Sequence, residues 1–374
     1  GGPLKKPTLQ GAFLLDGARI GRVDIPIGVL SLGSAQGGYG GQLKLGFPDG
    51  SDFISDVFLP VEVDLSQIPT TEQILSAEGL EINIRGKGLP MQIVEPFVSG
   101  FRAEAGIIQL EGSVLGSVNH PQPDLHLLVK DGKFSMDQTG VDYTDVNTRL
   151  SLSQNKLSLE NLVISTPREG DLQPSFLQAN MEAILNEDWS PSQATGEFNF
   201  DNFRVSDLPD QQIRISGHPQ IVTMKDQIQL MGKVENDQNI KIDQALVRLK
   251  EDFFSGDTRD QLYPDIVIKG EEPTEQAISE GMDALLAGIP SWFRAILDVD
   301  LGQDIFGAVA MPMEDRFGKL GRDFSTIKVE SAIAGLLHVE LSQSKLLVTG
   351  DMKPDRGQVR ILGKVFALKQ GSIS

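Results

Sequence analysis

The chain has 374 residues, a formal net charge of −19 and no cysteine. This length allows two or three ordinary domains or one long β structure. The acidic balance excludes a nucleic-acid partner, because phosphate binding needs clustered Lys and Arg. The missing cysteines exclude disulfides, thiolate metal sites and cysteine nucleophiles.

The sequence contains no segment that is typical of a spanning helix or a signal peptide. No apolar run approaches the ~20 residues that a spanning helix requires. The opening residues, Gly1–Pro7, are too short and too polar for a signal peptide. We therefore expect the chain to be a fragment of a longer protein.

Apolar and polar residues alternate in short runs from one end of the chain to the other. Strict alternation gives a strand one dry face and one wet face, whereas the strands of a parallel α/β sheet are apolar throughout. The pattern therefore predicts an all-β fold, a long antiparallel sheet with one apolar face. The alternating runs are Val61–Leu65, Leu80–Arg85, Leu157–Glu160, Gln212–Ser216 and Gln358–Ile361.

Glycines between apolar residues mark a degenerate repeat of strand–turn units. Leu110–Val114, Leu230–Val234 and Leu362–Val365 share this form, at an irregular spacing that excludes a strict solenoid period. The last stretch, Gly350–Ile373, is typical of an antiparallel meander. We expect an elongated β structure over residues 1–270 that continues over residues 298–374.

One amphipathic helix is expected within the β pattern, over about residues 274–289. Thr274 caps its start and Pro290 ends it. We assign residues 271–297 to this helical insertion, which either docks on a sheet edge, covers an apolar groove, or contacts a membrane or partner. A shorter helical turn is expected over residues 70–77. The apolar face of the longer helix consists of Ile278, Met282, Leu285, Leu286 and Ile289.

Motifs for catalysis, metal binding or a cofactor are not found in the sequence. The four histidines lack metal-ligand spacing. No helical pattern follows Gly37–Gly41, so this run indicates a turn or bulge and not a phosphate loop. Carboxylate pairs such as Asp351 and Asp355 carry little information in a chain with 52 acidic residues. We expect a protein that is not an enzyme and that uses no cofactor and no metal.

The terminal segment Thr349–Ile373 resembles a stretch of the TamB family, which belongs to the AsmA-like superfamily. In that stretch a glycine, an aspartate and a hydrophobic residue are followed by glycines that each precede a hydrophobic residue. The corresponding residues here are Gly350–Met352, Gly357–Val359, Gly363–Leu368 and Gly371–Ile373. Weaker matches lie at Phe13–Gly17, Ile25–Val29, Gly112–Val114, Pro121–Leu125, Gly132–Phe134 and Tyr143–Val146.

The resemblance implies a long β sheet curled into a trough with an apolar interior, in the periplasm of a Gram-negative bacterium. Full-length members are anchored in the inner membrane by an N-terminal helix, which has no counterpart in this sequence. The implied role is envelope biogenesis without catalysis. The trough would carry phospholipid acyl chains between the inner and outer membranes, or support outer-membrane protein assembly with a barrel protein of the TamA type.

We expect the apolar residues of the alternating runs to line this trough. The alternative is that they pack only against one another, in the closed core of a structural or adhesive β-sandwich. A third class, a carbohydrate-active β-helix enzyme, would need exposed aromatic side chains, and two Trp and three Tyr residues argue against it. The predicted groove residues are Val61, Val63, Leu65, Leu80, Ile82, Ile84, Leu125, Leu127, Leu157, Leu159, Ile213, Ile215, Leu346, Val348, Val359, Ile361, Phe366 and Leu368.

Overall fold

The fold is almost entirely β, as the alternation predicts. Among the described residues, twenty strands belong to one mixed sheet, accompanied by a short α-helix, α1 (Thr71–Leu75), and a 3-10 helix, η1 (Met91–Phe97). The all-β prediction is confirmed. The computed structural model describes residues 7–61, 69–166, 175–225, 227–233, 238–249, 289–302, 305–312, 326–343, 345–361 and 364–369.

The chain divides into two compact units. The first consists of Gly1–Gln138, Asp142–Ser165 and Ala179–Ser192, and the second of Thr139–Val141, Thr166–Gln178 and Gln193–Ser374. Each unit is described by itself below.

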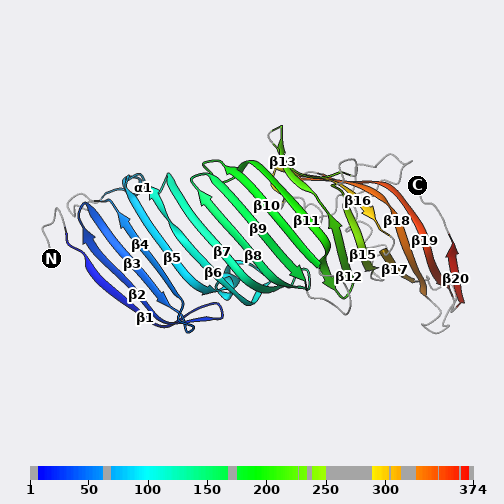
Figure 1. The fold of residues 1–374 in the computed structure, drawn as a ribbon, viewed down its shortest axis with the longest axis horizontal. Coiled ribbons are helices and arrows are strands. Elements are labelled where there is room, and N and C mark those ends of the chain that lie inside the picture. Colours follow the sequence, from blue (N-terminus) through cyan, green and yellow to red (C-terminus); the bar gives the residue numbers. More distant parts are fainter. Residues whose placement is uncertain are drawn as a thin grey trace. The chain divides into compact units, whose positions relative to one another are not determined.

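In the first unit, strands that follow each other in the chain lie side by side (Figure 1). Antiparallel pairing runs without interruption from β1 to β7, β8 pairs with β9 in the same sense, and β10 also pairs with β9. The strands are β1 (Gln10–Ile20), β2 (Val23–Ala35), β3 (Gly38–Gly46), β4 (Asp52–Leu59), β5 (Leu80–Pro90), β6 (Phe101–Gly116), β7 (Pro121–Met136), β8 (Val141–Ser153), β9 (Lys156–Thr166) and β10 (Ser175–Leu185).

The second unit has a less regular order of strands. β11 pairs with β12 and β13, and the chain closes with an antiparallel β18–β19–β20 meander. Three pairings are parallel, β14 with β16 and β15 with both β16 and β17. The strands are β11 (Pro191–Leu208), β12 (Gln211–Gly217), β13 (Gln220–Met224), β14 (Gln227–Gly232), β15 (Ile240–Leu249), β16 (Phe293–Leu301), β17 (Ile305–Pro312), β18 (Thr326–Ser342), β19 (Lys345–Ile361) and β20 (Lys364–Lys369).

The sheet is therefore mixed and not antiparallel throughout. Parallel neighbours need a connection of about a dozen residues or more, whereas a hairpin needs only two. In the chain, β15 and β16 are separated by residues 250–292.

The predicted helical segments have different outcomes. The turn expected over residues 70–77 is confirmed as α1, which begins with a capping box. The Gln73 N–H donates to Thr70 Oγ1 at 3.3 Å, and the Thr70 N–H donates to Gln73 Oε1 at 2.9 Å. Nearly all of the helix expected over residues 274–289 lies outside the described residues. The end of the predicted insertion, residues 293–297, belongs to strand β16.

A repeat glycine marks a point where two strands come unusually close. Gly112 in β6 has a φ of +148°, and a Cβ on it would lie 2.0 Å from the carbonyl oxygen of Asp124 in β7. No side chain fits this space, so glycine is required for the approach of the two backbones.

Candidate functional site: the apolar face of the sheet

The strand register of the first unit places predicted groove residues on one face. Ile84 of β5 lies opposite Gly112 of β6, which in turn lies opposite Leu125 of β7. In the next row, Leu110 lies opposite Leu127. Because side chains alternate between the faces of a strand, the predicted residues of β5 and β7 share this face: Leu80, Ile82, Ile84, Leu125 and Leu127.

Strands β8 and β9 continue the same face. The Gln154 N–H, in the turn between them, donates to the Pro123 carbonyl of β7 at 2.7 Å and fixes the register of β8 beside β7. Across the β8–β9 pair, the predicted residues Leu157 and Leu159 lie opposite leucines of β8. The leucine and isoleucine side chains of this face are mostly half-buried. We refer to these rows on β5 to β9 as the apolar face.

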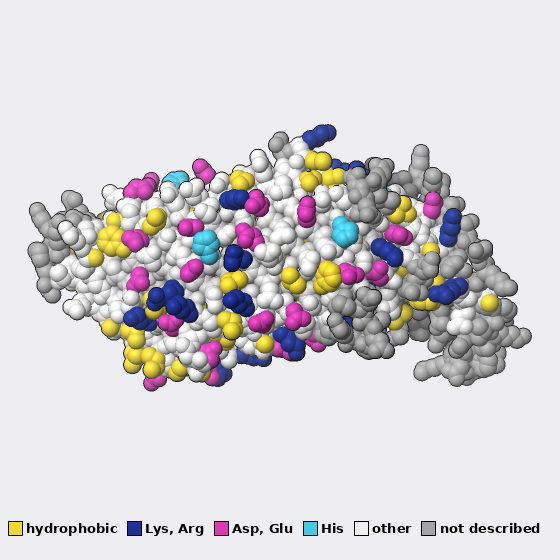
Figure 2. Space-filling model, in the orientation of Figure 1, with side chains coloured by type: hydrophobic (Ala, Val, Ile, Leu, Met, Phe, Trp, Pro, Cys, Tyr) yellow, Lys and Arg dark blue, Asp and Glu magenta, His cyan; other side chains and the backbone are white. Residues whose placement is uncertain are grey.

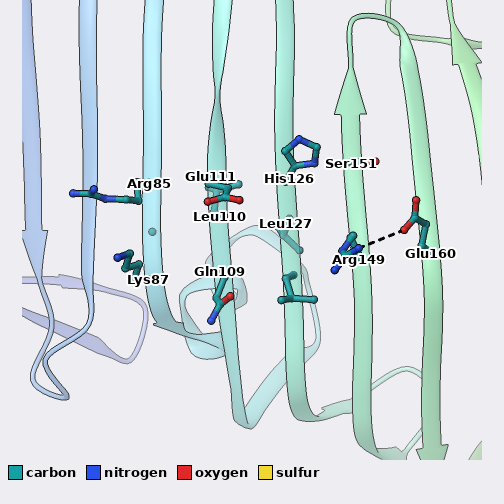
Figure 3. A pocket seen from close by; sticks show the side chains of 12 residues that line it. Arg85, Lys87, Gln109, Leu110, Glu111, His126, Leu127, Arg149, Ser151 and Glu160 are labelled. Carbon is teal, nitrogen blue, oxygen red and sulfur yellow. Dashed lines mark ion pairs between the residues drawn. The ribbon is translucent and has the colours of Figure 1, made fainter.

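The other face of the same strands is charged. Arg85 lies opposite Glu111, and Glu111 lies opposite His126. Arg149 and Glu160 form an ion pair with 3.9 Å between Nη1 and Oε2. Figure 3 shows these side chains around a hollow of about 510 Å³ on five consecutive strands. Figure 2 shows Lys, Arg, Asp and Glu side chains, with hydrophobic side chains among them, on the face in view. The charged face is thus suited to water.

Helix η1 covers one end of the apolar face. Met91, its first residue, is buried, and its Sδ lies 3.1 Å from the position that a Cβ would take on Gly106 or Gly132. Next to it, Ile108 of β6 lies opposite Val129 of β7, and both side chains are buried. The apolar rows therefore pass from a closed end under η1 to a half-buried stretch around Ile84 and Leu127.

An ion pair holds η1 in place. The Glu95 carboxylate accepts hydrogen bonds from the Arg22 guanidinium, with 2.8 Å between Nε and Oε2, and from the Ala103 N–H at 2.8 Å. Arg22 also donates to the Ala103 carbonyl at 2.8 Å. The hydrogen bond from Arg22 is the main cause that holds the pKa of Glu95 below its usual value. This cluster ties the β1–β2 turn to η1 and β6.

In the second unit, predicted residues of β12 belong to a closed cluster. Ile213 lies opposite Ala245 of β15 and packs against a core of Ala245, Leu301 and Ile305, which are each less than a tenth exposed. Ile215 lies opposite Ile242, which packs against the same core. Around these two residues the apolar side chains pack against one another.

Predicted residues of β19 lie on an apolar face of the second unit. Leu346 and Val348 lie opposite Leu341 and Val339 of β18, and all four are half-buried. On the other face of these strands, His338 Nδ1 lies 2.8 Å from Asp298 Oδ1, and Arg294 pairs with Glu340. The separation into an apolar and a charged face therefore holds in this unit as well.

The remaining predicted residues are either outside a strand or incompletely described by the structure. Val61 is buried and follows β4 without being part of a strand. Val63 and Leu65 lie outside the described residues. Four more lie in β19 and β20, but their side chains are outside the described set: Val359, Ile361, Phe366 and Leu368.

A model of the TamB C-terminal domain matches residues 177–374, which is more than half of the chain. The chain belongs to the TamB family. No curated protein and no solved structure matches it. TamB-family proteins belong to the Gram-negative cell envelope, where they take part in envelope biogenesis with TamA-type partners, and the family is one of assembly and transport rather than catalysis.

The TamB-family chain has further residues on its apolar face that sequence reasoning missed. Leu150 and Leu152 of β8 lie opposite Leu159 and Leu157, and Leu110 of β6 lies opposite Leu127. The run Leu150–Leu152 alternates as strictly as Leu157–Leu159, so the same pattern predicts both of its leucines on the apolar face. In β6, the glycine at 112 interrupts the apolar alternation and hides it.

Neither a metal site nor a spanning helix is found in the described part of this TamB-family chain. Among the described residues, no three His, Asp or Glu side chains are placed to hold a metal ion. The described helices are too short to cross a membrane.

Proposed function

We propose that the apolar face of this TamB-family chain binds phospholipid acyl chains and passes them along its rows, between the inner and outer membranes in the periplasm. The observation that carries the proposal is the half-burial of most of the leucine and isoleucine side chains of the apolar face on β5 to β9. In the described part of the first unit, strands make contact mainly with neighbouring strands of the same sheet, and η1 makes contact with β6. An acyl chain is the partner that such a face fits chemically.

The energy of this contact is sufficient for binding. Burial of one CH₂ group contributes about 0.8 kcal/mol, so a palmitoyl-length chain gains on the order of 10 kcal/mol on an apolar surface before the cost of ordering it. The headgroup remains in water. Because neighbouring rows of leucine and isoleucine have similar affinity for CH₂ groups, a chain can move from row to row without a chemical step. A protein of this kind needs no catalytic residue.

A paired substitution tests the proposal. Leu127 lies on the apolar face and Leu128, the next residue, lies on the charged face opposite Gln109. Leu127→Glu places a carboxylate among acyl chains at a cost of several kcal/mol, and we expect it to abolish transfer of a fluorescent phospholipid between vesicles. Leu128→Glu introduces the same residue on the charged face of the sheet and should leave transfer close to that of the unsubstituted chain.

The control for this experiment is that both variants remain folded. Circular dichroism of both variants should retain the β spectrum. Equal transfer by the two variants, with both folded, would contradict a role for the apolar face in lipid binding.

The second candidate is a structural or interaction module with a closed core. The cluster around Ala245, Leu301 and Ile305 favours it locally, because Ile213 packs there against protein. In such a module Leu127→Glu would unfold the first unit, and the unsubstituted chain would transfer no lipid.

A further inference from the structure

A second hollow lies in the first unit, at the ends of the strands. Its volume is about 410 Å³, within the range of about 300–1,000 Å³ that is usual for small-molecule sites. Three connections form it: the β6–β7 loop, the β8–β9 turn and the β10–β11 turn. The lining residues are Asn119, His120, Pro121, Gln122, Gln154, Asn155, Leu185, Asn186, Glu187 and Trp189.

Backbone hydrogen bonds hold each of the three connections. The Asn119 N–H donates to the Leu75 carbonyl at the end of α1 at 3.1 Å, and the Leu185 N–H donates to the Asn155 carbonyl at 2.8 Å. The β10–β11 turn closes through the Trp189 N–H, which donates to the Asn186 carbonyl at 3.0 Å. The hollow is therefore held by backbone contacts and does not depend on a ligand to form.

Trp189 occupies a backbone conformation that tryptophan rarely adopts. Its φ is +65°, and this left-handed region costs a residue with a Cβ about 1–2 kcal/mol, so such turns normally use glycine or asparagine. Burial in a core does not offset this cost, because the Trp189 side chain is 43% exposed. A strained aromatic residue on a surface indicates a functional demand.

Several polar side chains line the hollow together with Trp189 and have no side-chain partner among the described residues. Asn119, His120, Gln122, Gln154 and Glu187 make no side-chain hydrogen bond or ion pair with any other residue that the structure describes. By contrast, the amide groups of Asn155 and Asn186 donate within the turns, to the Leu185 carbonyl and to Ser190 Oγ. The first group thus offers free donors and acceptors at the rim of the hollow.

We propose that this hollow, which we call the Trp189 pocket, binds a neutral saccharide unit. A pyranose ring has one apolar face of C–H groups, which stacks on an exposed indole, and a rim of hydroxyls, which pair with planar amides. The net charge of −19 and the carboxylate of Glu187 disfavour an anionic sugar. A single carboxylate in the pocket supports binding without cleavage, since glycosidases use two. The proposal does not depend on lipid binding by the apolar face.

Calorimetric titration with triacetylchitotriose and with maltotriose tests the pocket. We expect saturable binding of at least one of these neutral oligosaccharides by the unsubstituted chain. Trp189→Asn keeps a residue that tolerates positive φ and removes the platform, so affinity should fall about tenfold or more. Gln122→Ala should weaken binding about 3- to 10-fold.

Two matched variants serve as controls. Trp292→Phe changes the other tryptophan, and Gln193→Ala removes an exposed glutamine of β11 outside the pocket; both should bind as the unsubstituted chain does. In Trp292→Phe the indole emission comes from Trp189 alone and should shift on binding. The proposal is overturned by the absence of binding of both sugars at millimolar concentration, by unchanged affinity of Trp189→Asn, or by tighter binding of trigalacturonic acid.

Discussion

Single positions decide which face of the sheet a side chain occupies. Leu127 and Leu128 are identical residues one position apart, yet the first lies opposite Leu110 in an apolar row and the second opposite Gln109 on the charged face. Composition alone does not distinguish them. Period-two alternation does, and it assigns Leu127 to the apolar face from sequence.

Glycine 112 provides a prediction at the same scale. Gly112→Ala places a Cβ against the Asp124 carbonyl at a positive φ, and we expect a loss of about 1–3 kcal/mol in the free energy of unfolding. Urea denaturation measures this. Gly11→Ala in β1 is the control, because nothing lies within 4 Å of its Cβ position, and its stability should be unchanged or higher. Equal effects of the two substitutions would show that the strand approach at Gly112 is not tight.

At the scale of elements, sequence patterns were most informative where strands are regular. Leu80–Arg85 and Leu157–Glu160 alternate strictly and lie in β5 and β9. In β6 the sequence shows only a glycine repeat. The apolar alternation of this strand is disturbed by the glycine at 112 and by register shifts near Ala103 and Ala105. The parallel pairings of β15 depend on distant residues, and no local pattern encodes them.

The candidate site was predictable to a similar extent. Alternation predicts which face of its own strand each residue occupies, and the strand register lines up Ile84 and Leu125 through Gly112; their role in a groove stays a prediction. It could not show that Ile213 packs into a closed cluster, because the side chains that cover it come from β15, β16 and β17. The Trp189 pocket was equally hidden, since three separate turns form it.

The η1 element gives a pH-dependent prediction. The hydrogen bond from Arg22 lowers the pKa of Glu95 in the folded chain below the ordinary value of 4.5. Ionised Glu95 therefore stabilises the fold fully at pH values above 4.5. This stabilisation is lost as the pH falls through the pKa of Glu95 in the folded chain. Glu95→Gln should therefore lower the urea midpoint at pH 7. The difference from the unsubstituted chain should shrink below about pH 4.5.

Glu197→Gln is the matched control for this variant, since Glu197 is exposed on β11. Its midpoint should follow that of the unsubstituted chain at both pH values. If the difference in urea midpoint between Glu95→Gln and the unsubstituted chain stays constant from neutral to acid pH, the ion pair is not its cause.

At the scale of the whole molecule, the proposed function rests on the separation of two faces within each unit. Ionic pairs such as Arg149 with Glu160 keep one face in water, while the rows around Ile84 and Leu127 are apolar and half-buried. Membership of the TamB family places this arrangement in envelope biogenesis. The proposed binding of acyl chains would require only apolar surface and no catalytic motif.

Native mass spectrometry of the chain purified from a Gram-negative host, followed by lipid extraction, tests the central claim most directly. The account predicts mass peaks shifted by bound phospholipid in the unsubstituted chain and in Leu128→Glu, and their loss in folded Leu127→Glu. A lipid-free mass for the unsubstituted chain, or the same bound lipid in folded Leu127→Glu, would contradict it.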